Sequence, residues 1–342
     1  MKNIDRVMSA MEGKKTDRRA VSLTLPMYGA RLTGCPLKEY YSDPRAYARG
    51  QAAVRETFGP DVLFGPFGLA LEGSAFGSQV KYLEKQAPNL AYPAVTSLKD
   101  IVKVDLPDIE SHPVLTFFRE SIRIMAKEHG DEVPILAICL SPADLPAMIL
   151  GIEGWIDTLL FSPDGVNRVL DITIPFFVKW INALIGEGAT AAVLPMAFSN
   201  PTVVTREIAR DITISALRVA LPEISCPVLI HSAGASLSPF IDLFVGLENV
   251  AGFVLNGRDS FSAAREKVGP EPLLIGNIDG PTLYTRNGED VFRECMEVLE
   301  DRKGDPRFIL GSSAADIAYE TPLESIRAFR EAAEAFEGRN YS

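Results

Sequence analysis

The chain has 342 residues, of which 47% are hydrophobic and 23% charged, as in ordinary soluble globular proteins. Its formal net charge of −11 argues against nucleic acid or an anionic membrane as the main partner, because both repel an acidic surface. The four scattered cysteines form no C-x-x-C pair and predict no disulfide framework. The amino-terminal segment lacks an apolar signal core and no run of about 18 apolar residues follows, so we expect a cytoplasmic protein.

Eight short apolar runs recur along the chain, most of them too continuous for half-exposed strands. This pattern is typical of parallel strands buried on both faces. A polar or glycine-rich turn follows each run, and a helical pattern follows in almost every case, which predicts an α/β protein with a (β/α)8 TIM barrel. A doubly wound sheet is the competing fold, but its glycine-rich phosphate fingerprint is absent. In chain order the runs are AVSLTL (20–25), DVLFG (61–65), PILAICL (134–140), AAVLPM (191–196), PVLI (227–230), GFVL (252–255), PLLIG (272–276) and RFIL (307–310).

Helix signals between these runs support the repeat. Ser162 before Pro163 predicts an N-cap with proline at the first helical position. The stretch 321–324 has the form of a capping box that opens the last helix. Residues 290–303 place their apolar side chains roughly on one helix face.

The chain is expected to form a single TIM-barrel domain over residues 1–342, because no low-complexity linker divides it. Residues 1–19 and 66–113 are extra to the repeat. The second segment, after the second strand, is predicted to be an insertion near the barrel mouth.

Polar residues in the loops after the strands are the candidates for a site, since barrels of this kind build their active sites there. Any of them could instead serve a turn or a helix cap. His231, directly after the run 227–230, stands out, but a metal site needs further ligands. Cys226 would lie about 16 Å away at the other end of the strand, so no metal site is predicted. The candidates are Tyr28, Arg31, Glu72, Asn200, His231, Asn256, Asp259, Asn277, Asp279 and Asp316.

Several of these segments carry a family resemblance. The stretches LTLPMYGARLTG, ICLSPADLPAMILGIEGW, LIHSAG, LIGNIDG and ILGSSAADIAYETPLESIRAF resemble the uroporphyrinogen decarboxylase superfamily in sequence and order. The resemblance covers essentially the whole chain and is closer to the corrinoid-dependent methyltransferase branch. It implies a (β/α)8 barrel and the exchange of a methyl group with a corrinoid protein.

The departures from that branch bear on the chemistry. Its thiol-methylating members carry a His-x-Cys and a further cysteine near the last strand, which bind zinc and hold the acceptor as a thiolate. Here the first motif is His231-Ser232-Ala233 and the last-strand region is 312–316, SSAAD. No zinc is therefore expected. Uroporphyrinogen decarboxylase itself is disfavoured, because 27–31 (MYGAR) lacks one arginine that the family uses for substrate carboxylates.

An amine acceptor needs no zinc, and N5 of tetrahydrofolate is a weakly basic amine. The leading hypothesis is therefore methyl transfer from methylcobalamin, or another corrinoid on a partner protein, to tetrahydrofolate. His231, Asn256 and Asp259 are the predicted catalytic residues: His231 orients the pterin or takes the N5 proton, and the other two hold the pterin edge. The predicted substrate-binding residues are Asn200, Asn277, Asp279, Asp316, Tyr28, Arg31 and Glu72.

Three alternatives stay open. The chain could be a demethylase that takes a methyl group from an amine or ether, a decarboxylase, or a non-catalytic scaffold that binds a corrinoid protein. The corrinoid is expected on a separate protein, since no Asp-x-His-x-x-Gly motif is present. A homodimer is one option for the oligomeric state.

Overall fold

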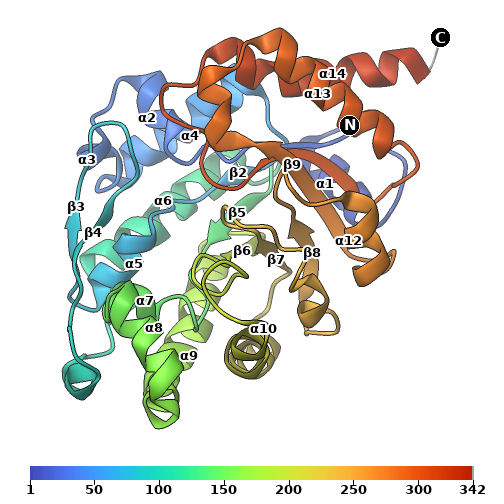
Figure 1. Cartoon of the computed structure of the whole chain (residues 1–342). Coiled ribbons are helices and arrows are strands. Elements are labelled where there is room, and N and C mark those ends of the chain that lie inside the picture. The colour runs from blue at the N-terminus through green and yellow to red at the C-terminus, as the bar shows by residue number, and fades with distance from the viewer. Residues whose placement is uncertain (341–342) are drawn as a thin grey trace.

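A computed structural model describes residues 1–340 and confirms the predicted (β/α)8 barrel (Figure 1). Eight parallel strands form one sheet in the order β1-β10-β9-β8-β7-β6-β5-β2. Each predicted apolar run overlaps one of them, although β7, β8, β9 and β10 extend beyond the predicted bounds. The strands are β1 (Val21–Ser22), β2 (Leu63–Phe64), β5 (Ile135–Ile138), β6 (Ala191–Pro195), β7 (Val228–His231), β8 (Val250–Val254), β9 (Leu273–Asp279) and β10 (Phe308–Ser313).

The seam between β1 and β2 is closed by one aspartate rather than by a full strand ladder. The Asp61 backbone N–H donates to the Val21 carbonyl at 2.8 Å, and the Asp61 carboxylate accepts from the Val21 N–H at 2.8 Å. Arg6 and Arg18 both donate to the same carboxylate. The barrel is therefore joined at this seam by a buried charge cluster.

Side chains alternate between the barrel interior and the layer of helices, as parallel strands buried on both faces require. Within β5, Leu136 and Ile138 belong to the cluster of apolar side chains inside the barrel, which we call the inner cluster. Ile135 and Ala137 pack against the helices. In β7, Leu229 points inward. His231 is two residues further along the same strand, so the alternation directs its imidazole into the barrel as well.

Helices surround the barrel, and α1 covers its amino-terminal end (Figure 1). The connection between β7 and β8 contains only the short η4, which departs from the expected strand–helix repeat. The helices are α1 (Asn3–Met11), α2 (Tyr28–Thr33), α3 (Leu37–Tyr40), α4 (Pro44–Phe58), α5 (Leu69–Ala75), η1 (Leu98–Lys103), α6 (Pro113–His129), α7 (Pro146–Ile149), α8 (Ile152–Phe161), α9 (Pro163–Gly186), α10 (Arg206–Ile208), η2 (Ala209–Ile214), α11 (Ser215–Ala220), η3 (Leu221–Glu223), η4 (Ile241–Phe244), α12 (Phe261–Val268), η5 (Gly280–Thr285), α13 (Gly288–Asp301) and α14 (Leu323–Asn340).

The helix-start predictions meet mixed outcomes. Pro163 does begin α9, but the Ser162 side chain makes no capping bond. The predicted capping box before α14 is wrong in its hydrogen bonding, because the buried Thr321 Oγ1 has no partner. The Thr321 carbonyl is used instead, as an acceptor for Tyr28 and Arg31. Helix α13 is N-capped by the side chain of Asn287.

The segment between β2 and β5 adds α5, an antiparallel hairpin, η1 and then α6. The hairpin consists of β3 (Gln79–Lys81) and β4 (Asn89–Tyr92). Its connecting residues 85–89 face the loop after β10 across a groove. The insertion therefore contributes to one wall at the carboxyl ends of the strands.

One helix among the described residues, α9, is long and apolar enough to cross a membrane by length and composition. Its side chains Phe176, Phe177 and Trp180 are buried. Trp180 packs edge-on against Phe118 of α6 with ring centroids 5.8 Å apart. These contacts are those of a core helix.

Candidate functional site

An apolar cavity of about 110 Å³ lies inside the barrel at the carboxyl ends of the strands. We call it the inner chamber. Its lining comes from β1, β2, β5, β6, β7 and β10 and the loops that follow them, and it is almost wholly carbon. Its lining is Thr24, Phe64, Phe67, Leu69, Ile138, Val193, Pro195, Ala197, His231, Ala233, Ala314, Ala315 and Asp316.

His231 contributes one of the two unpartnered polar atoms of the chamber wall. Its Nδ1 accepts the backbone N–H of Ala233 at 2.9 Å, so the neutral ring carries its proton on Nε2. Nε2 is buried and has no hydrogen-bond partner. Burial lowers the pKa of His231 to about 4. The imidazole is therefore neutral at pH 7 and presents an N–H donor to the chamber.

Asp316, in the loop after β10, contributes the second unpartnered polar atom of the chamber wall. Its Oδ1 is buried without a partner, and burial raises its pKa to about 7. Asp316 also borders an outer groove of about 590 Å³, which shares Phe67, Leu69 and Ala315 with the inner chamber. The groove runs between the hairpin residues 85–89 and the loop after β10. Asp316 thus stands where the two spaces meet.

The residues of the chamber do not fit a zinc ion. No group of three or more His, Cys, Asp or Glu residues able to hold a metal occurs in the described part of the chain. At the two positions where the resemblance would place thiolates, the chamber wall has the methyl groups of Ala233 and of Ala314 or Ala315. A zinc-bound imidazole also usually donates its second N–H, but Nδ1 of His231 is held as an acceptor.

The backbone at two chamber positions is strained. Ala233 has φ of 49° and Ala314 has φ of 70°, a left-handed conformation that is uncommon for residues other than glycine. Each such residue costs on the order of 1–3 kcal/mol, and such residues cluster at ligand sites. At Ala233 the conformation places the N–H that orients His231.

Three predicted residues tie neighbouring loops together instead of facing the chamber. The Asp259 carboxylate accepts from Ser236 Oγ and from the backbone N–H groups of Leu237, Ser238 and Asn256. Asn256 Oδ1 accepts from the Arg258 N–H. Asn277 Nδ2 donates to the Asp259 carbonyl at 2.9 Å. This network joins the loops after β7 and β8 to strand β9.

Tyr28, Arg31 and Glu72 make comparable connections. The Tyr28 hydroxyl donates to the Thr321 carbonyl at 2.6 Å, and Arg31 donates to the Tyr319 and Thr321 carbonyls. The loops after β1 and β10 are therefore fastened together. Glu72 accepts from the Leu140 N–H at 3.0 Å, and burial raises its pKa to about 8. It does not line the inner chamber.

Asn200 and Asp279 lie outside the chamber lining as well. Asn200 Nδ2 donates to the Met196 and Ala197 carbonyls, and its Oδ1 accepts from Thr202 N and Oγ1. Its hydrogen-bonding capacity is used within its own turn. Asp279 ends β9, and its buried Oδ1 has no partner.

Phe64 and Phe67 are chamber residues that were not among the predicted candidates. They lie on β2 and directly after it, and both line the chamber. The alternation of Val62 and Phe64, both in the inner cluster, was the available signal. Apolar side chains at a strand end do not by themselves distinguish core from site.

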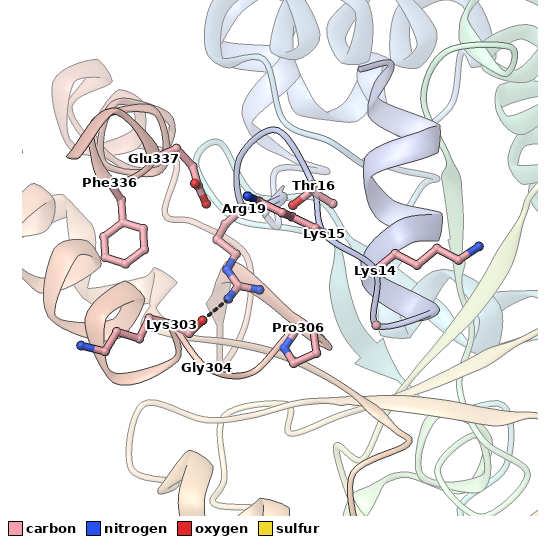
Figure 2. Close-up of a pocket in the computed structure, with 10 residues that line it drawn as sticks. Lys14, Lys15, Thr16, Arg19, Lys303, Gly304, Pro306, Phe336 and Glu337 are labelled. Carbon is pink, nitrogen blue, oxygen red and sulfur yellow. Dashed lines mark hydrogen bonds between the residues drawn. The ribbon is translucent and has the colours of Figure 1, made fainter. Parts of the chain in front are cut away.

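A larger cavity of about 630 Å³ lies at the opposite, amino-terminal end of the barrel (Figure 2). Arg19 crosses it and donates to the carbonyls of Arg302, Lys303 and Asp305. The ammonium groups of Lys14 and Lys303 point away from it in Figure 2, paired with Glu12 and Glu300. Since polar residues at this end of such barrels usually serve stability, we regard the inner chamber as the candidate active site.

Comparisons with known proteins confirm the resemblance drawn from the sequence. The profile of the uroporphyrinogen decarboxylase (URO-D) family matches residues 2–336. A methylcobamide:CoM methyltransferase, MtaA, of Methanosarcina barkeri is 23% identical over 337 residues, 94% of this chain and 95% of the relative. A methylated-thiol–coenzyme M methyltransferase of Methanosarcina mazei is 25% identical, covering 84% of this chain and 76% of the relative.

Decarboxylases are also among the relatives, and a solved methyltransferase shares the fold. A uroporphyrinogen decarboxylase of Trichlorobacter lovleyi is 25% identical over 89% of this chain and 91% of the relative. A methyltransferase structure from Methanosarcina mazei superposes with a TM-score of 0.88 at 20% identity, covering 100% of both chains. At that identity the superposition shows a common fold.

Proposed function

Because the chain belongs to the uroporphyrinogen decarboxylase family, we propose that it is a corrinoid-dependent methyltransferase whose methyl acceptor is tetrahydrofolate and which needs no zinc. The relatives MtaA and the methylated-thiol enzyme supply the reaction class, methyl transfer. The observation that carries the finer proposal is the pair of unpartnered atoms, His231 Nε2 and Asp316 Oδ1, in a chamber without metal ligands.

The two spaces at the mouth divide the work of binding. The inner chamber is too small to enclose a whole pterin, because a cavity of about 150 Å³ is filled by one benzene ring. The outer groove, which Asp316 joins to the chamber, has room for the remainder of the molecule. We assign Asp316 to N5 of the pterin and the His231 N–H to a ring acceptor.

The reaction is an in-line displacement. The N5 lone pair attacks the methyl carbon of the methylated corrinoid, the carbon–cobalt bond breaks, and its electron pair stays on cobalt as Co(I). The proton of the N5 ammonium must then leave. Asp316 suits this step because its pKa of about 7 is close to neutral pH. His231, with a pKa of about 4 and its Nδ1 already engaged, is assigned to orientation rather than proton removal.

The protein's contribution is chiefly positioning and the exclusion of water. Asn256, Asp259 and Asn277 hold the loops that shape the mouth, so their proposed role is indirect. The corrinoid is carried by a partner protein that delivers the methyl group at the mouth. A decarboxylase acting on a substrate rich in carboxylates finds no lysine or arginine among the described residues that line the chamber.

An anaerobic assay with purified protein, methylcobalamin and tetrahydrofolate tests the proposal by following the cobalt absorbance. We expect loss of methylcobalamin with folate, unchanged by a chelator and by added zinc. Coenzyme M replaces folate in a parallel run. Turnover only with the thiol and zinc would contradict both the acceptor and the metal-free mechanism.

A further inference from the structure

Asp316 is half-buried between the two spaces, and its Oδ1 faces an apolar wall that lacks a cation. Buried carboxylates are ordinarily paired or fully hydrogen-bonded, as Asp61 is with Arg6 and Arg18. Asp316 Oδ1 has no partner. Among the described residues that line the inner chamber, none is a lysine or arginine, and the one imidazole is held neutral.

The surroundings of Asp316 match those that proteins use for methylated ammonium groups. Such groups bind against the faces of aromatic rings with a carboxylate nearby. The chamber supplies the rings of Phe64 and Phe67 and aliphatic carbon from Leu69, Ile138 and Val193. Lys85 of the outer groove is already paired with Glu320 at 2.6 Å, so it does not neutralise the chamber.

The size of the chamber limits the ligand further. About 110 Å³ is somewhat less than the cavity that holds one benzene ring, about 150 Å³. A tetramethylammonium or trimethylammonium group is about as bulky as one benzene ring, so it would fill the chamber and extend into the adjoining outer groove. A strongly hydrated primary ammonium would lose its water hydrogen bonds in the apolar wall, which favours the methylated cation.

From these contacts we infer that the inner chamber binds a small quaternary methylammonium compound through Asp316, Phe64 and Phe67, and that this compound is a methyl donor. This goes beyond the transfer to folate proposed above, since it adds a second activity in which the corrinoid is methylated. The two ligands would compete for the same chamber.

Apart from the cobalt of the partner's corrinoid, the chemistry requires no metal ion held by this chain and no proton transfer. The Co(I) of the reduced corrinoid on the partner attacks a methyl carbon of the quaternary ammonium. The carbon–nitrogen bond breaks, its electron pair goes to nitrogen, and a neutral tertiary amine leaves. Since the leaving group is already neutral, the absence of a Lewis acid or general acid beside His231 is compatible with this step.

Binding alone tests the site, independently of any turnover. Titration calorimetry compares choline with 3,3-dimethylbutanol, which replaces the charged nitrogen by carbon at nearly the same shape. We expect choline to bind at least about tenfold more tightly. Asp316→Asn should remove most of this difference, whereas Glu84→Gln, which removes an exposed charge from the hairpin, should retain it.

A second variant guards against a folding defect in the first. Phe67→Leu keeps an apolar side chain of similar size, and it should weaken choline several-fold while leaving the neutral alcohol nearly unchanged. Equal binding of the two compounds by the wild-type protein, or an unchanged choline affinity in Asp316→Asn, would overturn the inference.

Turnover separates this inference from the folate proposal. Photochemically reduced cob(I)alamin and tetramethylammonium should give methylcobalamin and trimethylamine, whether or not folate is an acceptor. If choline binds and folate is methylated, choline should raise the KM for folate without lowering kcat. Folate turnover without choline binding would contradict only the inference of a methylammonium site. Choline binding without folate turnover would contradict only the proposal that folate is the methyl acceptor.

Discussion

The two ends of the barrel both bury charged side chains, but they treat them differently. At the amino-terminal end, Asp61 is 0% exposed and lies 2.7 Å from Nη1 of Arg6 and 2.7 Å from Nη1 of Arg18. At the mouth, His231 Nε2 and Asp316 Oδ1 are buried without any partner. The buried charges at the amino-terminal end are therefore paired within the protein, whereas His231 Nε2 and Asp316 Oδ1 at the mouth have no partner within it.

This difference separates stability from function. A buried polar atom without a partner costs roughly 1–3 kcal/mol, so a folded protein keeps one where something else completes it. At the seam, the Asp61 carboxylate is paired with Arg6 and Arg18. This cluster serves only to join β1 to β2. Most polar residues around the mouth are hydrogen-bonded between loops. His231, Asp316 and Asp279 each have a buried polar atom without a partner, and of these three His231 and Asp316 line the inner chamber.

The largest expected effect is a loss of stability when the charge cluster at the amino-terminal end is disrupted. Asp61→Ala leaves Arg6 and Arg18 buried without a counter-charge, which should lower the free energy of unfolding by about 3–5 kcal/mol. Urea denaturation followed by circular dichroism measures it. Asp301→Ala, which removes an exposed carboxylate paired with Arg302, is the matched control and should cost less than about 1 kcal/mol. Equal midpoints for the two variants would contradict the assigned role of the seam.

The second prediction concerns His231, at the mouth of the barrel. His231→Ala should lower kcat/KM for methyl transfer by about 100-fold, because it removes the N–H donor from the chamber. The free energy of unfolding should fall by only about 1–3 kcal/mol, because the variant loses the bond that Nδ1 accepts from Ala233 N–H, whereas Nε2 had no partner in the fold. His112→Ala, at the start of α6 and away from the chamber, should leave kcat/KM unchanged. A His231 variant that unfolds readily yet retains its rate would reverse this assignment.

A third change tests whether Asp259, which links neighbouring loops, serves stability as the seam cluster does. Asp259→Ala abolishes the acceptor for Ser236 and three backbone N–H groups, so it should cost about 2–3 kcal/mol of stability. Asp242→Ala, which breaks a surface pair with Arg206, should cost less than about 1 kcal/mol. If Asp259 contacts the substrate directly, the variant would instead lose activity at unchanged stability.

The fourth prediction concerns how stability depends on pH. The pKa of Asp316 is raised to about 7 from roughly 3.9 in an unfolded chain, so the native state holds a proton that the unfolded state has lost. Its contribution to stability therefore falls as pH rises from about 4 to about 7. The pKa of His231 is lowered to about 4 from roughly 6.5, and its contribution rises with pH from about 4 to about 6.5.

These two slopes oppose each other in the wild-type protein. Asp316→Asn removes the falling contribution, so stability should rise more steeply with pH up to about 6.5 and the variant should gain on the wild type up to about pH 7. Urea midpoints at several pH values between about 5 and 8 measure the difference. Parallel curves for the two proteins would show that Asp316 is not held in an apolar wall.

The barrel itself could be predicted from local pattern. Runs such as 134–140 and 227–230 are continuous and apolar because their strands are buried on both faces, and each overlaps a strand of the sheet. His231 could be placed at a strand end for the same reason. The absence of the zinc thiolates, at 233 and within 312–316, could also be read from the sequence.

Which polar residues are free could not be predicted, since that depends on partners far away in the chain. Asp259 accepts from residues 236–238, and Tyr28 reaches the carbonyl of Thr321. In the sequence, Asp259 and Asp316 are both aspartates in strand-end loops. Local pattern determined the barrel and the place of His231, because strand burial is written in consecutive residues. Only the tertiary structure decided that Asp259 is a tie and Asp316 an unpaired acid, because hydrogen bonding between loops joins residues that sequence spacing leaves unrelated.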